Sequence, residues 1–234
     1  MKFDVITSFN ETYYNNIGKD CVETWLKYWP AEMSLTCYVE EFELPAQDRI
    51  KQISFDQLPA EYREFQQSDE RGRVKLFAKK AYSIIHAMNN TDADRIIWVD
   101  ADVITEKSSP ISVLEKLCKK DQLATYMQVY HEVDDKTFVS AETGFFILNT
   151  RHEYFPKFRD RYTEYYNKHL KENLRRFYDG EVFGAVISEL ETECSVNNLC
   201  KDFEKKYKSP LKHTPLGEYI IHHKSKHSKD NYGN

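Results

Sequence analysis

Hydrophobic residues alternate along the chain between short continuous runs and longer stretches with helical spacing. In the first half, continuous apolar runs predict strands at residues 3–9, 35–42 and 95–99. Apolar positions three or four residues apart predict helices at residues 13–29 and 74–88. This order of elements is typical of a layered α/β fold.

The second half continues the same alternation after a break in the first. Residues 47–67 are polar and contain Pro59, which predicts an irregular segment. The expected later elements are strands at 124–130, 144–149 and 218–222, and helices at 111–119, 154–173 and 179–190.

The run at residues 95–99 is apolar at nearly every position, which is typical of a strand buried on both faces of a parallel sheet. We therefore expect one Rossmann-like domain over residues 1–234, with a mostly parallel central sheet flanked by helices. Within it, we expect residues 1–105 to form a nucleotide-binding half and residues 106–234 an acceptor-side half.

Composition narrows the function classes. The 234 residues are 41% hydrophobic and 30% charged, which indicates a soluble globular protein of one domain. The chain has only 7 glycines, so a glycine-rich phosphate loop is not expected. A net charge of −5 argues against non-specific nucleic-acid binding.

Other sequence signals indicate the compartment. The 5 cysteines are scattered and form no Cys-x-x-Cys pair, which argues against zinc and disulfide frameworks. No apolar run is long enough to span a membrane, and the N-terminus has no signal-peptide core. We expect a cytoplasmic protein without a transmembrane segment.

The candidate chemistry lies in Asp100-Ala101-Asp102, which follows the buried run. Ligands bind outside the carboxyl ends of strands in open α/β sheets, and two carboxylates two residues apart can point the same way from an extended backbone. The small Ala101 leaves space for close approach. Two oxygen ligands suit Mg²⁺ or Mn²⁺, and such an ion neutralises charge on a leaving diphosphate. The alternative is that Asp100 and Asp102 are surface acids at the end of a strand and bind no metal.

The segment Trp98-Val99-Asp100-Ala101-Asp102-Val103 resembles the Asp-x-Asp site of GT-A-fold glycosyltransferases, including glycogenin-like and viral or bacterial sugar transferases. Four further segments resemble that family in order along the chain, at residues 77–82, 142–149, 178–181 and 220–224. The resemblance implies a metal-dependent glycosyltransferase, a hexosyl- or pentosyltransferase that uses Mn²⁺ or Mg²⁺ and a UDP- or GDP-sugar.

The resemblance also implies individual roles. It places Asp100 near the ribose and metal, and Asp102 as a direct metal ligand. Residues expected to contact the nucleotide sugar are Thr7, Ser8, Asn10, Tyr13, Lys79 (or Lys80), Asp100, Ala101, Lys224 and Lys226. Each has a structural alternative: Asn10 suits a helix cap, Tyr13 suits packing, and the lysines suit a solvated surface. The chain lacks the Gly-x-x-Lys-Pro-Trp ending of glycogenin-like enzymes, which weakens the diphosphate role of Lys224 and Lys226.

Two adjacent histidines follow the last expected strand. A neutral imidazole binds Mn²⁺, and neighbouring residues of a strand point to opposite sides. Only one of His222 and His223 therefore faces the metal, and the family position favours His222.

An inverting transferase needs a carboxylate that takes a proton from the acceptor hydroxyl. Asp179 is the first candidate, followed by Glu142 and Glu181. Asp179 is equally placed to cap the helix that follows it. A retaining enzyme does not need the base in this place.

Two other functions compete with the transferase. A haloacid-dehalogenase-like phosphatase also places Asp-x-Asp after an apolar strand, but normally after the first strand. A non-catalytic module would bind nucleotide in the same cleft. The acceptor stays open between a glycan, a lipid-linked sugar, a protein and a modified DNA base.

Overall fold

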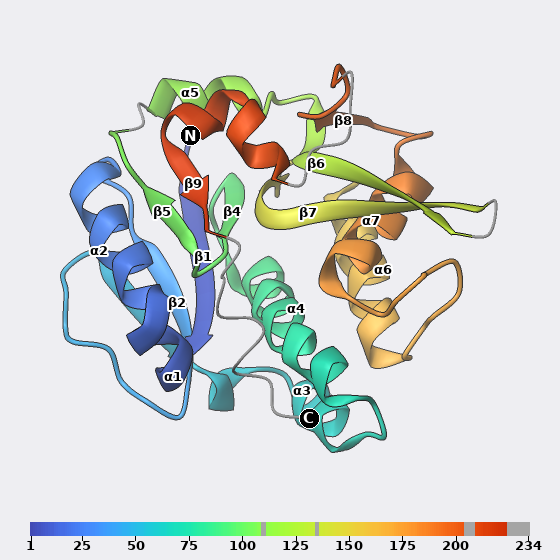
Figure 1. Ribbon diagram of the computed structural model, residues 1–234, viewed down its shortest axis with the longest axis horizontal. Helices are drawn as coiled ribbons and strands as arrows, with labels where there is room; N and C mark the ends of the chain where they lie inside the picture. Colours follow the sequence, from blue (N-terminus) through green and yellow to red (C-terminus); the bar gives the residue numbers. More distant parts are fainter. Residues whose placement is uncertain (109–110, 134–135, 204–208, 224–234) are drawn as a thin grey trace.

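The computed structural model describes residues 1–108, 111–133, 136–203 and 209–223. Its centre is a seven-stranded sheet in the order β3-β2-β1-β4-β7-β6-β8 (Figure 1). The strands are β1 (Phe3–Asn10), β2 (Leu35–Glu40), β3 (Ile50–Ser54), β4 (Arg95–Val99), β6 (Gln122–Val133), β7 (Lys136–Asn149) and β8 (Ser195–Asn198).

The first four strands of the sheet are parallel, and the direction changes at β7. Strand β1 pairs in parallel with β2 and β4, and β2 pairs in parallel with β3. Strand β7 is antiparallel to both β4 and β6, whereas β8 is parallel to β6. The sheet is thus mixed and mostly parallel, as the sequence predicted.

Both faces of the sheet are covered, because side chains alternate between two hydrophobic clusters. In β4, Ile96 and Trp98 lie in one cluster and Ile97 and Val99 in the other. The first cluster contains α3 (Ala60–Gln67), α4 (Gly72–Asn90), α6 (Phe155–Asn167) and α7 (Asp179–Leu190). The second contains α2 (Lys19–Tyr28) and α5 (Ile111–Leu117). Burial on both faces explains the continuous apolar run in β4.

Short elements complete the fold. Strand β1 leads through α1 (Glu11–Tyr13) and a π-helical turn (Tyr14–Gly18) into α2. A separate antiparallel ribbon pairs β5 (Val103–Thr105) with β9 (Ile220–His222). Three 3₁₀ turns lie at Phe55–Gln57, Pro210–His213 and Pro215–Glu218. The ribbon brings the end of the described chain beside β4 (Figure 1).

Several sequence predictions need correction. The segment 47–67 is not irregular, because it contains β3 and α3. Its apolar residues are interrupted by polar ones on the exposed sheet edge and helix face, which hides the period. The helix expected over 154–173 ends at Asn167, where His169 adopts a positive φ of 51°. The strands β5 and β8, of three and four residues, were missed.

Among the described residues, no helix has both the length and the apolar character needed to cross a membrane.

Candidate metal centre and adjoining cavity

Asp100 and Asp102 lie where β4 ends, at the turn that leads into β5. The Asp100 amide donates to Gly144 O at 2.9 Å, which continues the pairing with β7. The Val103 amide then donates back to Asp100 O at 3.0 Å. The two carboxylates therefore converge because the chain turns, not because it stays extended as expected from sequence.

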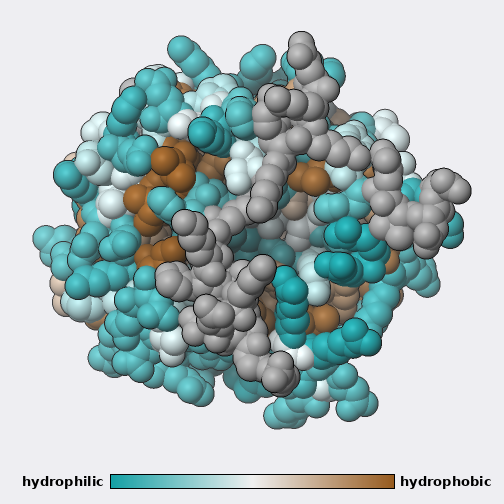
Figure 2. Space-filling model, in the orientation of Figure 1, coloured by the Kyte–Doolittle hydropathy of each residue, from teal (hydrophilic) through white to brown (hydrophobic). Residues whose placement is uncertain are grey.

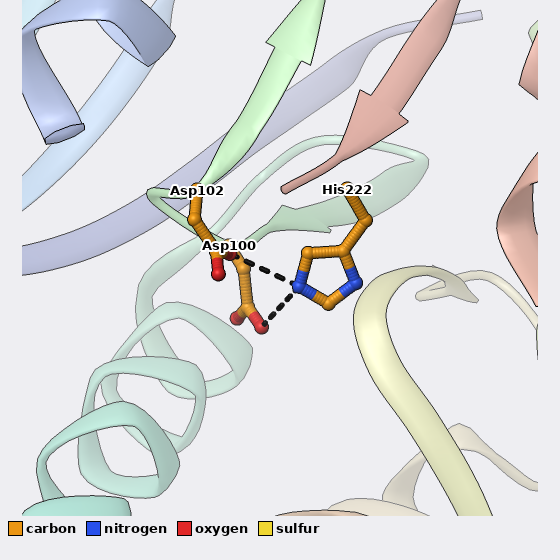
Figure 3. A group of neighbouring side chains, drawn as sticks. All are labelled: Asp100, Asp102 and His222. Atoms are coloured by element: carbon orange, nitrogen blue, oxygen red, sulfur yellow. Dashed lines mark ion pairs between the residues drawn. The ribbon is translucent and has the colours of Figure 1, made fainter. Parts of the chain in front are cut away.

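His222 completes this group from the other strand of the small ribbon. The register of β5 and β9 pairs Val103 with His222. The His222 Nε2 atom lies 3.0 Å from Asp102 Oδ1 and 3.9 Å from Asp100 Oδ2 (Figure 3). Two acids from the middle of the chain thus meet an imidazole that follows more than a hundred residues later.

The ring of His222 packs directly against the backbone of β7. A Cβ atom added to Gly144 would lie 2.5 Å from two atoms of that ring, closer than van der Waals contact allows. A side chain at position 144 would therefore displace the imidazole from the carboxylates. Glycine is required here by close approach, since its backbone angles are ordinary.

The three side chains fit a divalent cation. One ligand atom from each of Asp100, Asp102 and His222 lies within 4.8 Å of the others. Ligands at right angles around an ion with bonds of about 2.1 Å lie about 3.0 Å apart, and opposite ligands lie about 4.2 Å apart. The two distances from His222 Nε2, 3.0 Å to Asp102 Oδ1 and 3.9 Å to Asp100 Oδ2, fall in that span. Two carboxylates and one imidazole form a donor set suited to Mn²⁺ or Mg²⁺.

The acidic groups around His222 stabilise positive charge on its ring. Burial lowers the pKa of His222, but hydrogen bonds to Asp102 and Glu142 and the charge of Asp100 outweigh it, so the pKa rises to about 10. Burial also raises the pKa of Asp100, against the opposing charge of Lys80. The imidazole therefore carries a proton at neutral pH where a metal ion would otherwise supply the positive charge.

Lys80 holds Asp100 from the opposite side. Its Nζ lies 2.6 Å from Asp100 Oδ1, 2.9 Å from Asp179 Oδ2 and 2.7 Å from Thr143 O. Trp98 Nε1 also donates to Asp100 Oδ1 at 2.6 Å. Burial lowers the pKa of Lys80, but Asp100 and Asp179 outweigh it, so the lysine stays charged between two acids.

Sequence reasoning gave preference to Lys79 over Lys80, and the two occupy different places. Lys79 forms an ion pair with Glu40 at 2.6 Å at the edge of the cavity described next. Helical spacing was the available signal for Lys80, because position 80 follows Phe77 by three residues and precedes Ile84 by four. A lysine on the apolar face of a helix needs a buried partner.

A cavity of about 260 Å³ opens beside the acidic group. Its walls come from the end of β1, the segment after it, α4 and the end of β4. The lining residues are Ser8, Phe9, Asn10, Thr12, Tyr13, Asn16, Glu40, Phe55, Leu76, Phe77, Lys79, Lys80, Trp98, Asp100, Ala101 and Asp179.

Most of the residues expected to contact a nucleotide sugar line this cavity. Ser8, Asn10 and Tyr13 do, whereas Thr7 is fully buried and lies outside the lining. Asn10 also caps α1, since its Oδ1 accepts the Tyr13 amide at 2.8 Å. Lys224 and Lys226 lie outside the described residues.

The three candidate bases have different surroundings. Asp179 opens α7, lines the cavity, pairs with Lys80 and accepts the Thr143 hydroxyl at 2.5 Å. Glu142 Oε1 lies 3.4 Å from His222 Nδ1, on the side of the ring away from the aspartates.

Glu181 is engaged elsewhere. It accepts from the Arg175 guanidinium at 2.9 Å and from the Arg176 amide at 2.6 Å, and it does not line the cavity. The structure therefore brings Asp179 and Glu142 to the acidic group but not Glu181.

The two histidines separate as their alternation predicts. His222 turns to the carboxylates, while His223 is exposed and its backbone amide donates to Asp102 O at 2.9 Å. His223 thus supports the turn through its main chain.

Comparison with known proteins bears on the fold. No protein-family profile matches the sequence, and no curated protein sequence matches it. Solved structures do match. Mouse xyloside xylosyltransferase 1 in its apo form superimposes with a TM-score of 0.56 at 12% identity, over 86% of this chain and 86% of that chain.

Two further matches are also glycosyltransferases. The apo bifunctional glycosyltransferase WbbM matches with a TM-score of 0.59 and 12% identity over 96% of this chain and 46% of that chain. The apo glycosyltransferase GlyE of Streptococcus pneumoniae TIGR4 matches with a TM-score of 0.53 and 12% identity, over 100% of this chain and 57% of that chain. This chain thus spans about half the length of those two. It has a GT-A-like glycosyltransferase fold, with a candidate acidic metal group in it.

Proposed function

We propose that the protein is a metal-dependent glycosyltransferase that moves a sugar from a UDP- or GDP-sugar to an acceptor. The observation that carries this proposal is the convergence of Asp100, Asp102 and His222 beside a cavity of about 260 Å³. The fold shared with solved glycosyltransferases supports the same class.

A bound Mn²⁺ or Mg²⁺ would neutralise charge on the leaving diphosphate as a Lewis acid. Asp102 and His222 would hold it directly, and Asp100 would contribute from the end of β4. Lys80 and Trp98 both hold Asp100 Oδ1 and so leave its Oδ2 turned toward His222. The carboxylates are therefore oriented before any ligand arrives, which lowers the cost of binding.

The donor binds in the adjoining cavity in this proposal. Ser8, Asn10 and Tyr13 offer polar and aromatic contacts at one wall, and Ala101 leaves space between the two acids. Lys79 also lines the cavity, where it pairs with Glu40 at 2.6 Å. Lys224 and Lys226 keep the diphosphate role that the family resemblance implies.

We also propose that Asp179 acts on the reacting groups, followed by Glu142. Asp179 lines the cavity and forms an ion pair with Lys80, whose Nζ lies 2.9 Å from its Oδ2. Glu142 lies next to the metal group through His222. Glu181 ranks last, since its oxygens are occupied by Arg175 and the Arg176 amide.

The phosphatase alternative needs Asp100 as a nucleophile. One oxygen of Asp100 accepts from both Lys80 and Trp98, which lowers its nucleophilicity. This contact disfavours that reading. A non-catalytic nucleotide-binding module would use the same site. Only a measurement of donor turnover distinguishes such a module from a transferase.

The test is a thermal-shift screen of nucleotide sugars with and without Mn²⁺. A ligand that binds the folded state raises its apparent stability by mass action. We expect a UDP- or GDP-sugar to raise the melting temperature only with Mn²⁺, and Asp102→Asn to remove the shift. Asp121→Asn, at an exposed aspartate away from the cavity, is the matched control and keeps it.

Turnover then decides between enzyme and module. Release of free sugar or nucleotide from the donor identified in the screen is expected from the unchanged protein with Mn²⁺. Binding without any turnover, with or without candidate acceptors, supports the module instead. Full metal-dependent activity in Asp102→Asn contradicts the metal assignment.

A further inference from the structure

Three exposed arginines lie near the rim of the cavity, and within the part of the chain that the structure describes none of them pairs with an acid. Arg71 and Arg73 stand at the start of α4, and Arg176 lies in the loop between α6 and α7. Arg71 and Arg176 line a second hollow. The face of the molecule drawn in Figure 2 is mostly hydrophilic, with small hydrophobic patches. The other lining residues are Asp69, Glu70, Val74, Lys171, Arg175, Phe177 and Tyr178.

Aromatic rings connect this hollow to the cavity. The rings of Tyr178 and Phe77 lie 4.7 Å apart, and Phe77 lines the cavity. The Arg73 guanidinium lies 5.1 Å from the Tyr178 ring and 5.8 Å from the Phe77 ring. The Arg176 guanidinium lies 5.9 Å from the Tyr178 ring. Cation–π contacts thus hold two guanidinium groups over one ring at the cavity edge.

These charges are not neutralised by their neighbours. Within the described part of the chain, no ion pair involves Arg71, Arg73 or Arg176. The other cations of the hollow are paired, Lys171 with Glu70 at 2.6 Å and Arg175 with Glu181 at 2.9 Å. Asp69 is the remaining acid of the lining and is exposed.

Helix stability does not account for the two arginines on α4. The first turn of α4 contains no acidic residue, and a helix N-terminus is the positive end of the helix dipole. Arg71 and Arg73 therefore lie where a cation is disfavoured. An anion bound between them and Arg176 removes that repulsion.

The position of the arginines separates this anion from the donor diphosphate. Seven residues, about two helical turns or about 10 Å, separate Arg73 from Lys80, whose ammonium reaches Asp100. Oxygens of a diphosphate that share a metal ion lie within a few ångströms of that ion. Arg73 thus lies about two helical turns from Lys80 along α4, against Phe77 of the cavity wall.

We infer that the acceptor is an anionic sugar, carrying a phosphate or a carboxylate that Arg73 and Arg176 bind. This inference rests on the proposed function. A guanidinium presents paired N–H donors that match both oxyanions, and the rings of Tyr178 and Phe77 preorganise it. Arg71 adds a third charge at the rim. A neutral sugar leaves all three unpaired.

The test titrates three probes into the full chain: glucose 6-phosphate, glucuronate and methyl glucoside. Each is measured by calorimetry with and without Mn²⁺ and UDP. We expect one or both anionic sugars to bind at least about tenfold more tightly than methyl glucoside, since hydrogen bonds to charged groups are the stronger ones. The phosphate and carboxylate arms identify which oxyanion is preferred.

Variants locate the binding. The double variant Arg73→Gln with Arg176→Gln is expected to lose the tenfold preference. The control Arg63→Gln with Arg159→Gln removes the same amount of charge at positions outside the hollow, and we expect it to keep the tenfold preference for anionic sugars. Circular dichroism checks that both fold alike. Anionic sugars that bind no better than methyl glucoside, or equally well to the double variant, overturn the inference.

A separate measurement keeps the two proposals apart. The affinity of UDP or GDP with Mn²⁺ is expected to be unchanged in the arginine double variant. Failure of both nucleotides to bind the unchanged protein counts against the glycosyltransferase proposal, whereas the sugar titration without nucleotide still tests the arginines.

Discussion

Lys80 and Asp100 form a partly buried ion pair, with Nζ 2.6 Å from Oδ1 and with 11% of the lysine side chain and 26% of the aspartate side chain exposed. Asp179 joins the same ammonium at 2.9 Å. One lysine thus compensates two carboxylates in the core and orients the acid that faces the metal group.

Replacing Lys80 by methionine is expected to destabilise the fold by about 3–5 kcal/mol, because removal of one partner leaves buried charge uncompensated. Urea denaturation measures the loss. Lys79→Met is the neighbouring control and costs about 1 kcal/mol or less, since Lys79 is more exposed than Lys80 and pairs with one carboxylate instead of two. Equal losses in the two variants contradict the account of Lys80.

Gly144→Ala tests the contact between β7 and His222. The added methyl group would meet the imidazole at 2.5 Å, so we expect a lower Mn²⁺ affinity and a loss of about 1–3 kcal/mol in stability. Gly72→Ala is the matched control, because nothing lies within 4 Å of its added Cβ. An unchanged Mn²⁺ affinity in Gly144→Ala shows that the ring position does not matter for the metal.

Mn²⁺ binding is expected to strengthen as pH rises. Hydrogen bonds and nearby acids outweigh burial and raise the pKa of His222 to about 10 from its usual value near 6.5. Without metal, the extra stability from the charged ring is complete below about pH 6.5 and is lost as pH rises through about 10. Metal must displace this proton, so between these values affinity rises by up to about tenfold per pH unit.

Calorimetry in buffers of different ionisation enthalpy measures the released proton. We expect close to one proton per Mn²⁺ at neutral pH and a smaller release in His222→Gln. A Mn²⁺ affinity that does not change between pH 7 and 9 would contradict the displacement of a proton from His222.

Asp179→Asn is expected to lower turnover by about 10²–10⁴ with little change in donor affinity, if its carboxylate acts in the transition state. Steady-state kinetics with the donor found in the screen gives both quantities. Glu181→Gln is the comparison, and its effect is expected on stability, because Arg175 loses a buried partner. Equal effects of Asp179→Asn on turnover and donor affinity remove it from the catalytic candidates.

The sequence predicted the elements whose apolar pattern follows from burial. The run at β4 and the helical spacing of α4 and α7 agree with the structure because both faces of the sheet are covered. β3 and β8 lie at the two edges of the sheet, where fewer side chains are buried, so their patterns are weak. Strand β5 is too short to show any period.

The candidate site divides in the same way. Asp100 and Asp102 were identifiable because they directly follow a buried strand, and His222 because alternation leaves one of two histidines facing the site. The contacts of Lys80 with Asp179 and of Glu142 with His222 join residues far apart in the chain. Such contacts depend on how β7 and α7 pack, which local patterns do not contain.

The most direct test of the central claim is the anomalous scattering of manganese in crystals of the protein grown or soaked with Mn²⁺ and the nucleoside diphosphate. The account predicts one strong peak within about 2.0–2.3 Å of the Asp102 carboxylate and His222 Nε2, with diphosphate oxygens on its open side. Nucleotide bound in the cavity with no manganese between those side chains, or with both aspartates turned away from it, would contradict the account.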